Sequence, residues 1–318
     1  MEMLSSRHII ALQSVKGLGN ISVKRLADHA SKDDISSDEE LCELVMTCIA
    51  EKIITRVKNV TAESVRQGLD AADRIMEKAD RSGVGILSYG SDNYPQEMLC
   101  AVNCSGRPDI PLTLYCKGDL EALKHPGVAV IGTRHPSPAG RRHAEYCGER
   151  LAEAGCNIIS GLAAGCDAAA HRGALSCPGG RTTALLGHGL DTVYPREHAS
   201  LARDILEHDG LLISEYPLGT RVTPFTLTAR DRLQAALAQS VLVVQASAEG
   251  GTMLTARMAL AAGKFVRIFV QVFFTQADNI QHLDDPLAAF RLGDVVREVQ
   301  RRLHRLHDGL SWIERCKR

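Results

Sequence analysis

Six short, largely apolar runs recur at even spacing between residue 128 and residue 269, with helical patterns between them. They are Val128–Ile131, Asn157–Ser160, Thr183–Leu186, Leu211–Ser214, Val241–Gln245 and Phe265–Phe269. Apolar runs of this length are typical of strands buried on both faces of a parallel sheet. Strands that alternate with helices predict repeated βαβ units. The sequence therefore predicts an α/β fold, a Rossmann-like doubly wound, mostly parallel sheet.

The first eighty residues have a helical pattern instead. Ile9–Leu12 precedes Gly17-Leu18-Gly19, the helical pattern resumes over Ile21–Ala30, and a further helix is predicted over Thr61–Ser82. A Gly-x-Gly turn between two helices can present backbone N–H groups to a DNA phosphate, as in helix-hairpin-helix motifs. It can equally be an αα-hairpin that needs glycine for its turn. The sequence leaves both interpretations open.

Three regions are predicted along the chain. Residues 1–83 form a small helical N-terminal domain, residues 84–275 form the Rossmann-like domain, and residues 276–318 form a short helical extension. The Rossmann-like domain begins with strands near Ile86 and over Leu112–Gly118, ahead of the main repeat.

Composition limits the classes of function. The 318 residues are 45% hydrophobic and 24% charged with a formal net charge of −1, so any nucleic-acid binding has to come from a local patch. Aromatic residues make up 4%, which argues against a platform of stacking rings. The ten cysteines form no Cys-x-x-Cys pair, which favours reduced thiols over a metal site. With no signal region or apolar span in the sequence, we expect a cytoplasmic protein without a membrane segment.

Glycines follow the predicted strands where ligands bind in such sheets, beyond the carboxyl ends. These turns are Gly132-Thr133-Arg134, Ser160-Gly161, Gly187 and Gly250-Gly251-Thr252. A glycine turn that opens a helix lets the backbone approach a phosphate and points free N–H groups at it. The order is not G-x-G-x-x-G, so a dinucleotide-binding fingerprint is not supported.

Four arginines can lie at the same edge of the sheet: Arg134, Arg196, Arg230 and Arg232. Guanidinium groups near backbone N–H nests, with few aromatic rings, indicate a pocket for a chain of phosphates. The alternative is that each arginine is a solvated surface charge. The hypothesis of a phosphate pocket depends on these side chains gathering on one side of the molecule.

No reaction centre is recognisable. Asp167 and His171 are four residues apart on a predicted helix and favour a hydrogen-bonded pair that fixes the start of that helix. Glu215 is a candidate base, but no serine, cysteine or histidine is spaced to form a nucleophile–base pair with it. We therefore predict no catalytic residues, no metal and no cofactor.

An ordered set of motifs resembles the DprA/Smf family of DNA-processing proteins over residues 86 to 270. The motifs are Asp92-Asn93-Tyr94-Pro95, Leu114-Tyr115-x-Lys117-Gly118, Gly132-Thr133-Arg134, Ser160-Gly161-Leu162-Ala163 with Gly165, Asp167 and His171, Leu186-Gly187-x-Gly189-Leu190-Asp191 with Tyr194-Pro195, and Ser214-Glu215-Tyr216-Pro217.

The resemblance implies a dimeric, non-enzymatic, cytoplasmic protein that binds single-stranded DNA, protects incoming DNA and helps to load the RecA recombinase in natural transformation or recombination. Carried over by motif, it implies phosphate-binding roles for Arg134, for Arg196 after Tyr-Pro, for Arg230 and Arg232, and for the turn Gly250-Gly251-Thr252.

Three departures from the family pattern stand out. Asp231 replaces the asparagine between two arginines and puts a negative charge where phosphate would pass. Gln245 replaces an acidic residue at the end of the fifth strand. Beyond Lys264 the usual Val-Pro-Gly ending is absent. A nucleotide sensor or nucleotide-processing enzyme, with a role in defence, is therefore an alternative, as is a paralogue that binds only a protein partner.

Overall fold

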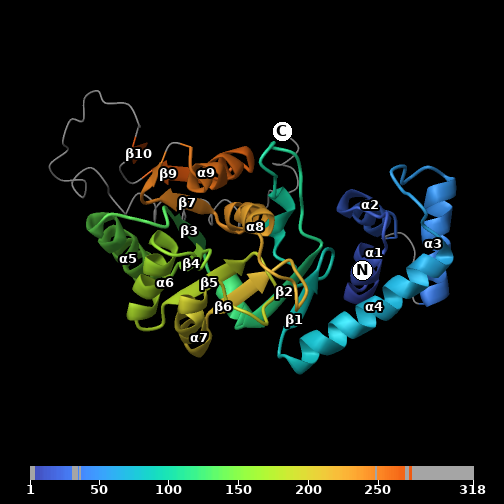
Figure 1. Ribbon diagram of the computed structural model, residues 1–318, viewed down its shortest axis with the longest axis horizontal. Coiled ribbons are helices and arrows are strands. Elements are labelled where there is room, and N and C mark those ends of the chain that lie inside the picture. Colours follow the sequence, from blue (N-terminus) through green and yellow to red (C-terminus); the bar gives the residue numbers. More distant parts are fainter. Residues whose placement is uncertain (1–3, 31–34, 36, 248, 269–271, 274–318) are drawn as a thin grey trace, which may run out of the picture.

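A computed structural model describes residues 4–30, 35, 37–247, 249–268 and 272–273 of the chain. Four helices at the N-terminus stand to one side of a sheet that is flanked by helices on both faces (Figure 1). The predicted helical extension, residues 276–318, lies outside the described residues, and the predicted division into three domains stays a prediction.

Within the described residues, the main sheet has eight strands in the order β1-β2-β6-β5-β4-β3-β7-β9. Their bounds are β1 (Gly85–Ser88), β2 (Thr113–Gly118), β3 (Gly127–Ile131), β4 (Asn157–Ser160), β5 (Arg181–Leu186), β6 (Leu211–Ser214), β7 (Ser240–Val243) and β9 (Phe265–Ile268). The run from β6 to β9 is parallel throughout, whereas β1 and β2 pair antiparallel at one end. The doubly wound, mostly parallel α/β fold is confirmed.

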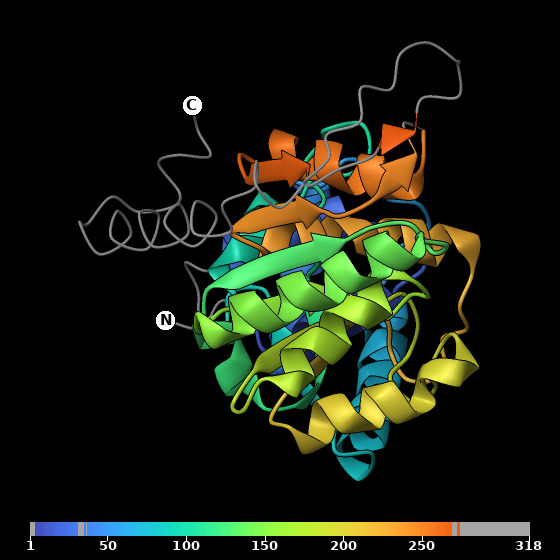
Figure 2. The same cartoon turned by 90° about the vertical axis from the view of Figure 1, so that its left-hand side faces the viewer.

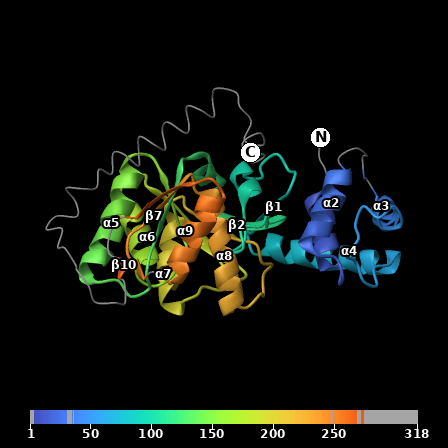
Figure 3. The same cartoon turned by 90° about the horizontal axis from the view of Figure 1, so that it is seen from above.

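The helices are sorted by face. Helices α5 (Pro138–Glu153), α6 (Cys166–Ser176) and α7 (Ala199–Glu207) cover one face and lie toward the viewer in Figure 2. Helices α8 (Pro224–Leu237) and α9 (Gly251–Ala261) lie side by side on the other (Figure 3). Alternate residues of a strand pack against the two helical layers, because successive side chains of a strand point to opposite faces of the sheet.

In β3, Val128 and Val130 pack with α5 and α6, while Ala129 and Ile131 pack in the cluster that includes α8 and α9. From β3 the chain moves outward through β4, β5 and β6, then returns by α8 to β7 on the other side of β3. The connections that follow β3 and β7 therefore leave in opposite directions. A reversal of this kind opens a crevice at the carboxyl ends of the two strands.

Short elements complete this part of the chain. Three 3-10 helices are η1 (Gln96–Cys100), η2 (Leu120–Lys124) and η3 (Arg196–His198). Strands β8 (Ala246–Ser247) and β10 (Val272–Phe273) form a separate parallel pair.

The N-terminal helices have a core of their own, which also includes Tyr89 and Leu112 from the sheet side. They are α1 (Ser6–Ser14), α2 (Asn20–Ala30), α3 (Asp38–Ala50) and α4 (Ala62–Arg81). Capping boxes at Ser37 and Thr61 satisfy the first N–H groups of α3 and α4. The Tyr89 hydroxyl donates to Asp28 at 2.7 Å, which ties α2 to the edge of the sheet.

The Gly-x-Gly turn lies between α1 and α2. Gly17 has a φ of +102°, and a Cβ there would overlap the carbonyl oxygen of Lys58. Close packing against the segment before α4 therefore accounts for Gly17, which supports the αα-hairpin interpretation. Within the part of the chain described, none of the helices combines the length and apolar character that a membrane crossing needs.

Candidate functional site

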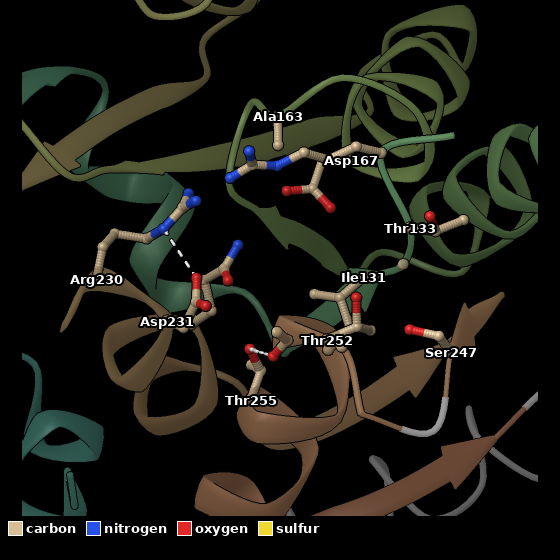
Figure 4. A pocket seen from close by; sticks show the side chains of 14 residues that line it. Ile131, Thr133, Ala163, Asp167, Arg230, Asp231, Ser247, Thr252 and Thr255 are labelled. Carbon is tan, nitrogen blue, oxygen red and sulfur yellow. Dashed lines mark hydrogen bonds and ion pairs between the residues drawn. The ribbon is translucent and has the colours of Figure 1, made fainter. Parts of the chain in front are cut away.

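A cavity of about 300 Å³ lies in the crevice between β3 and β7 (Figure 4). Five segments contribute its walls: the end of β3 with the loop after it, the start of α6, the middle of α8, the end of β8 (Ala246–Ser247) and the N-terminus of α9. Its polar lining residues are Thr133, Arg134, Asp167, Arg230, Asp231, Gln234, Ser247, Thr252 and Thr255, and its glycines are Gly132, Gly250 and Gly251. The site is thus built mainly from charged groups, hydroxyls and backbone.

The loop after β3 is fixed by backbone hydrogen bonds. The N–H of Thr133 donates to the carbonyl oxygen of Gln245 at 2.7 Å, and the N–H of Cys166 donates to the carbonyl oxygen of Thr133 at 3.2 Å. These contacts join the loop to the segment after β7 and to the start of α6. Arg134 follows at once and is exposed at the cavity, where a ligand can reach its guanidinium.

Gln245 supports the same loop rather than a ligand. Its side chain is buried, and its amide oxygen accepts a hydrogen bond from the N–H of Ser137 at 3.1 Å. Ser137 is the N-cap of α5 and accepts in turn from the N–H of Gly140 at 3.0 Å. A glutamine in place of an acidic residue therefore helps to fix the start of α5.

Arg230 lies at the base of the cavity and is almost fully buried. Its Nη1 donates to the carbonyl oxygens of Gly161, at 2.6 Å, and Leu185. A Cβ on Gly161 would overlap this guanidinium, so glycine is required there for the arginine to reach its partners. Gly161 thus acts through Arg230, which binds the ends of β4 and β5 together.

Two carboxylates accompany the arginines. Asp167 is buried and accepts a hydrogen bond from the N–H of Gly161 at 3.1 Å, and burial raises its pKa. Asp231 lies 3.3 Å from Nε of Arg230, and its side chain keeps 19% of its surface exposed. Burial raises the pKa of Asp231 to about 6, although the positive charge of Arg230 acts in the opposite direction and lowers this pKa.

The raised pKa of Asp231 predicts a pH-dependent stability difference. An unfolded chain ionises this carboxyl near pH 4, whereas the folded protein holds the proton until about pH 6. The stability that the protonated group supplies is therefore complete below pH 4 and is lost as the pH rises through 6. We expect Asp231→Asn, which stays neutral, to raise the free energy of unfolding at pH 7.5 by on the order of 1–3 kcal/mol.

Urea unfolding at pH 7.5 and pH 4 measures this difference. The gain should fade at pH 4, where both proteins carry a neutral side chain. A mutant that is less stable than wild type at pH 7.5 would contradict the account, because it would mean that the ion pair with Arg230 outweighs the cost of burying the charge.

Arg232 lies away from the cavity, and the expectation of four arginines on one rim is wrong in this respect. Its guanidinium donates to both carboxylate oxygens of Glu215, at 2.7 and 2.5 Å, and to the carbonyl oxygen of Asp109 at 3.0 Å. Its Nε also lies 2.9 Å from the Asp109 carboxylate. Only 4% of the Arg232 side chain is exposed, so this arginine is part of a buried ion-pair cluster.

Other predicted residues also lie outside the cavity lining. Arg196 is exposed at the start of η3. Ser160 is buried and its hydroxyl donates to the carbonyl oxygen of Val130 at 2.7 Å. A Cβ on Gly187 would lie 2.7 Å from the carbonyl oxygen of Thr226, so that turn packs against the start of α8. The structure brings together Gly132, Thr133, Arg134, Arg230, Gly250, Gly251 and Thr252.

The predicted Asp167–His171 pair does not form, since each side chain has another partner. Asp167 binds Gly161, and Nδ1 of His171 lies 2.6 Å from the hydroxyl of Thr182. Burial lowers the pKa of His171 to about 3, so the ring is neutral. Glu215, the candidate base, is held by Arg232. These contacts are structural.

A second cavity of about 330 Å³ adjoins the first and shares Arg134, Arg230, Asp231 and Gly251 with it. It extends toward the start of α8, and Tyr194 lines it. Sequence reasoning did not single out Tyr194 as a site residue, nor Gln234 and Thr255 in the first cavity. Gln234 and Thr255 could have been found by spacing, since each lies one helical turn after a predicted site residue, Arg230 or Thr252.

Comparison with known proteins decides the family. Residues 85–284, more than half of the chain, match the family described as DNA recombination-mediator protein A. The chain belongs to this family. The N-terminal helices lie ahead of the matched segment.

Curated proteins named Smf are similar to this chain in sequence. The chain is 40% identical to protein Smf of Escherichia coli K12 over 181 residues, which are 57% of this chain and 46% of that protein. It is 32% identical to protein Smf of Synechocystis over 255 residues, which are 79% of this chain and 61% of that protein. The chain thus spans about half to three fifths of the length of these relatives.

Solved structures of the family are also similar. The X-ray structure of DprA from Streptococcus pneumoniae superposes with a TM-score of 0.67 at 26% identity and covers 94% of both chains. A structure of DprA from Helicobacter pylori, described for its single-stranded DNA binding mode, has a TM-score of 0.55 at 27% identity and covers 69% of this chain and 96% of that one.

Proposed function

We propose that this protein binds single-stranded DNA and that the phosphates of the strand lie along the mouth of the cavity between β3 and β7. The observation that carries the proposal is the arrangement at its mouth: an exposed Arg134 beside the N-terminus of α9, which begins at Gly251. Free N–H groups at the start of a helix and a guanidinium suit phosphate oxygens. Both cavities share Arg134, so a strand can pass from one to the other.

The charged residues of the site differ in whether they are already paired, and this decides which of them can bind a phosphate. Arg230 is buried beside Asp231 and already donates to two carbonyl oxygens. Arg134 forms no ion pair among the residues that the structure describes. Because the other charges largely compensate each other, Arg134 is the cation available to an incoming phosphate.

Family membership supports a wider role. We propose that the protein is a non-enzymatic, cytoplasmic homodimer that protects incoming single-stranded DNA and assists RecA loading in transformation or recombination. The phosphate-binding roles of Arg196 and of the turn Gly250-Gly251-Thr252 are part of this proposal. Arg232 has no place in it, because its guanidinium is occupied by Glu215 and Asp109.

One observation favours a second candidate, a nucleotide sensor or nucleotide-processing enzyme. The cavity has a volume suited to one nucleotide, and Asp231 supplies a carboxylate that phosphate binding does not require. Such a protein would take a free nucleotide in place of a strand.

Fluorescence anisotropy with a labelled 20-nucleotide thymidine oligomer, together with thermal shifts for a panel of free nucleotides, separates the two functions. Single-strand binding predicts an affinity that falls steeply between 50 and 200 mM salt. Stabilisation by a free nucleotide, with oligonucleotides inert, would overturn the proposal and establish the second candidate.

A further inference from the structure

The α8 side of the first cavity carries two polar groups that phosphate binding does not explain. Asp231 and Gln234 lie one turn apart on α8, and both line the cavity. Residues three apart on a helix are neighbours on one face. In Figure 4, Asp231 stands on one side of the cavity, with Ile131 and Ser247 on the other.

Gln234 is buried with an unsatisfied donor. The residue is 2% exposed, and its amide nitrogen has no hydrogen-bond partner among the described residues. A buried donor without a partner costs about 1–3 kcal/mol, so a ligand in the cavity gains affinity if it supplies the acceptor. An acceptor on the ligand, next to Asp231, is therefore the first requirement.

Asp231 sets the second requirement. Its carboxylate lies 3.3 Å from Nε of Arg230 through one oxygen and also interacts with the side chain of Thr255, while the side chain keeps part of its surface open to the cavity. An ionised carboxylate only accepts hydrogen bonds, and it can accept two from adjacent donors. A ligand edge that offers one acceptor followed by two donors therefore matches both side chains.

We infer that this cavity receives a guanine base of the bound strand, read by Asp231 and Gln234. Among the four DNA bases, only the Watson–Crick edge of guanine presents a carbonyl acceptor followed by two N–H donors. Its O6 takes the hydrogen bond from Gln234, and its N1–H and 2-amino groups donate to Asp231. Adenine and cytosine place a ring-nitrogen acceptor against the carboxylate, and thymine places a carbonyl oxygen there.

The inference rests on the proposed binding of single strands and adds base preference to it. It also assigns a function to Asp231, the aspartate between Arg230 and Arg232. The strand backbone meets Arg134 and the start of α9, while Asp231 faces the base and not a phosphate. The cavity of about 300 Å³ has room for one base, and Ile131 and Ala163 supply apolar surface for it.

The test uses a 12-nucleotide thymidine oligomer with one central position replaced by guanine, hypoxanthine, adenine or cytosine, measured by anisotropy at pH 7.5. Hypoxanthine keeps O6 and N1–H but lacks the 2-amino group. We expect the guanine oligomer to bind about tenfold more tightly than the all-thymine oligomer, with hypoxanthine between them. In Asp231→Asn, the difference between guanine and hypoxanthine should disappear.

Two further variants separate the roles. Gln234→Leu should weaken the guanine and hypoxanthine oligomers alike, because both carry O6. Arg134→Ala should weaken all five oligomers by a common factor. Oligomers that bind wild type equally well, whatever their central base, would overturn the guanine inference and leave single-strand binding in place. A protein that binds none of them would overturn the proposed function.

Guanine could also arrive as a free nucleotide. Thermal shifts with GMP and AMP distinguish the sources: a shift with GMP that equals that of the guanine oligomer would overturn the assignment to a strand. A shift with the oligomer that exceeds that of GMP supports it.

Discussion

Replacement of Arg134 by alanine is expected to lower the affinity for single-stranded DNA by about tenfold or more at low salt. A hydrogen bond to a charged partner contributes about 1.5–3 kcal/mol, and each phosphate contact also releases bound counterions. The Arg134 side chain is exposed and lines both cavities. Its removal should therefore leave the fold intact and reduce the salt dependence of binding.

The matched control is Arg172→Ala. Arg172 is an exposed arginine on α6 that lines neither cavity, and its loss changes the net charge by the same amount. Anisotropy titrations of both variants at 50 and 200 mM salt make the comparison. Equal losses of affinity in the two variants would mean that only overall charge matters and would remove Arg134 from the site.

Arg232→Ala is expected to lower the free energy of unfolding by about 3–5 kcal/mol, the usual result of breaking a buried ion pair on one side. The substitution leaves Glu215, whose side chain is 11% exposed, without the guanidinium that satisfies both its oxygens. It also removes the contact with Asp109. Urea unfolding at pH 7.5 measures the change.

The double variant Arg232→Met with Glu215→Leu should recover much of this stability, because no charge then stays buried alone. Where Arg232→Ala stays folded, its affinity for single-stranded DNA should match that of wild type. A selective loss of affinity at unchanged stability would contradict the structural role of Arg232 and return it to the binding site.

The parallel strands of the sheet could be predicted from the sequence because each one depends on the residues of a single short segment. Buried parallel strands require continuous apolar runs, and the run at Val128–Ile131 corresponds to β3, Gly127–Ile131. The glycine turns also followed from the pattern, since helix starts and strand ends have their own signals. The antiparallel pairing of β1 with β2 could not be predicted, because no periodicity specifies which edge a strand joins.

The direction in which each arginine of α8 points could not be predicted from the motif. Arg230 and Arg232 are two residues apart on α8, and such positions lie on nearly opposite faces of a helix. Both could not face one cavity, and Arg232 turns instead to Glu215 and Asp109. Glu215 lies 17 residues before Arg232 in the sequence, and Asp109 lies 123 residues before it. The sequence could not show that both acidic residues contact Arg232 in the folded protein.

Photo-crosslinking with a bromodeoxyuridine oligonucleotide tests the location of the strand most directly. Tyr194 and Tyr146 are both 43% exposed, but only Tyr194 lines a cavity at the carboxyl edge of the sheet, while Tyr146 lies on α5. After irradiation and peptide mapping, we expect crosslinks at Tyr194 and in the loop around Arg134. Crosslinks at Tyr146, with Tyr194 unmodified, would contradict a DNA path through the crevice between β3 and β7.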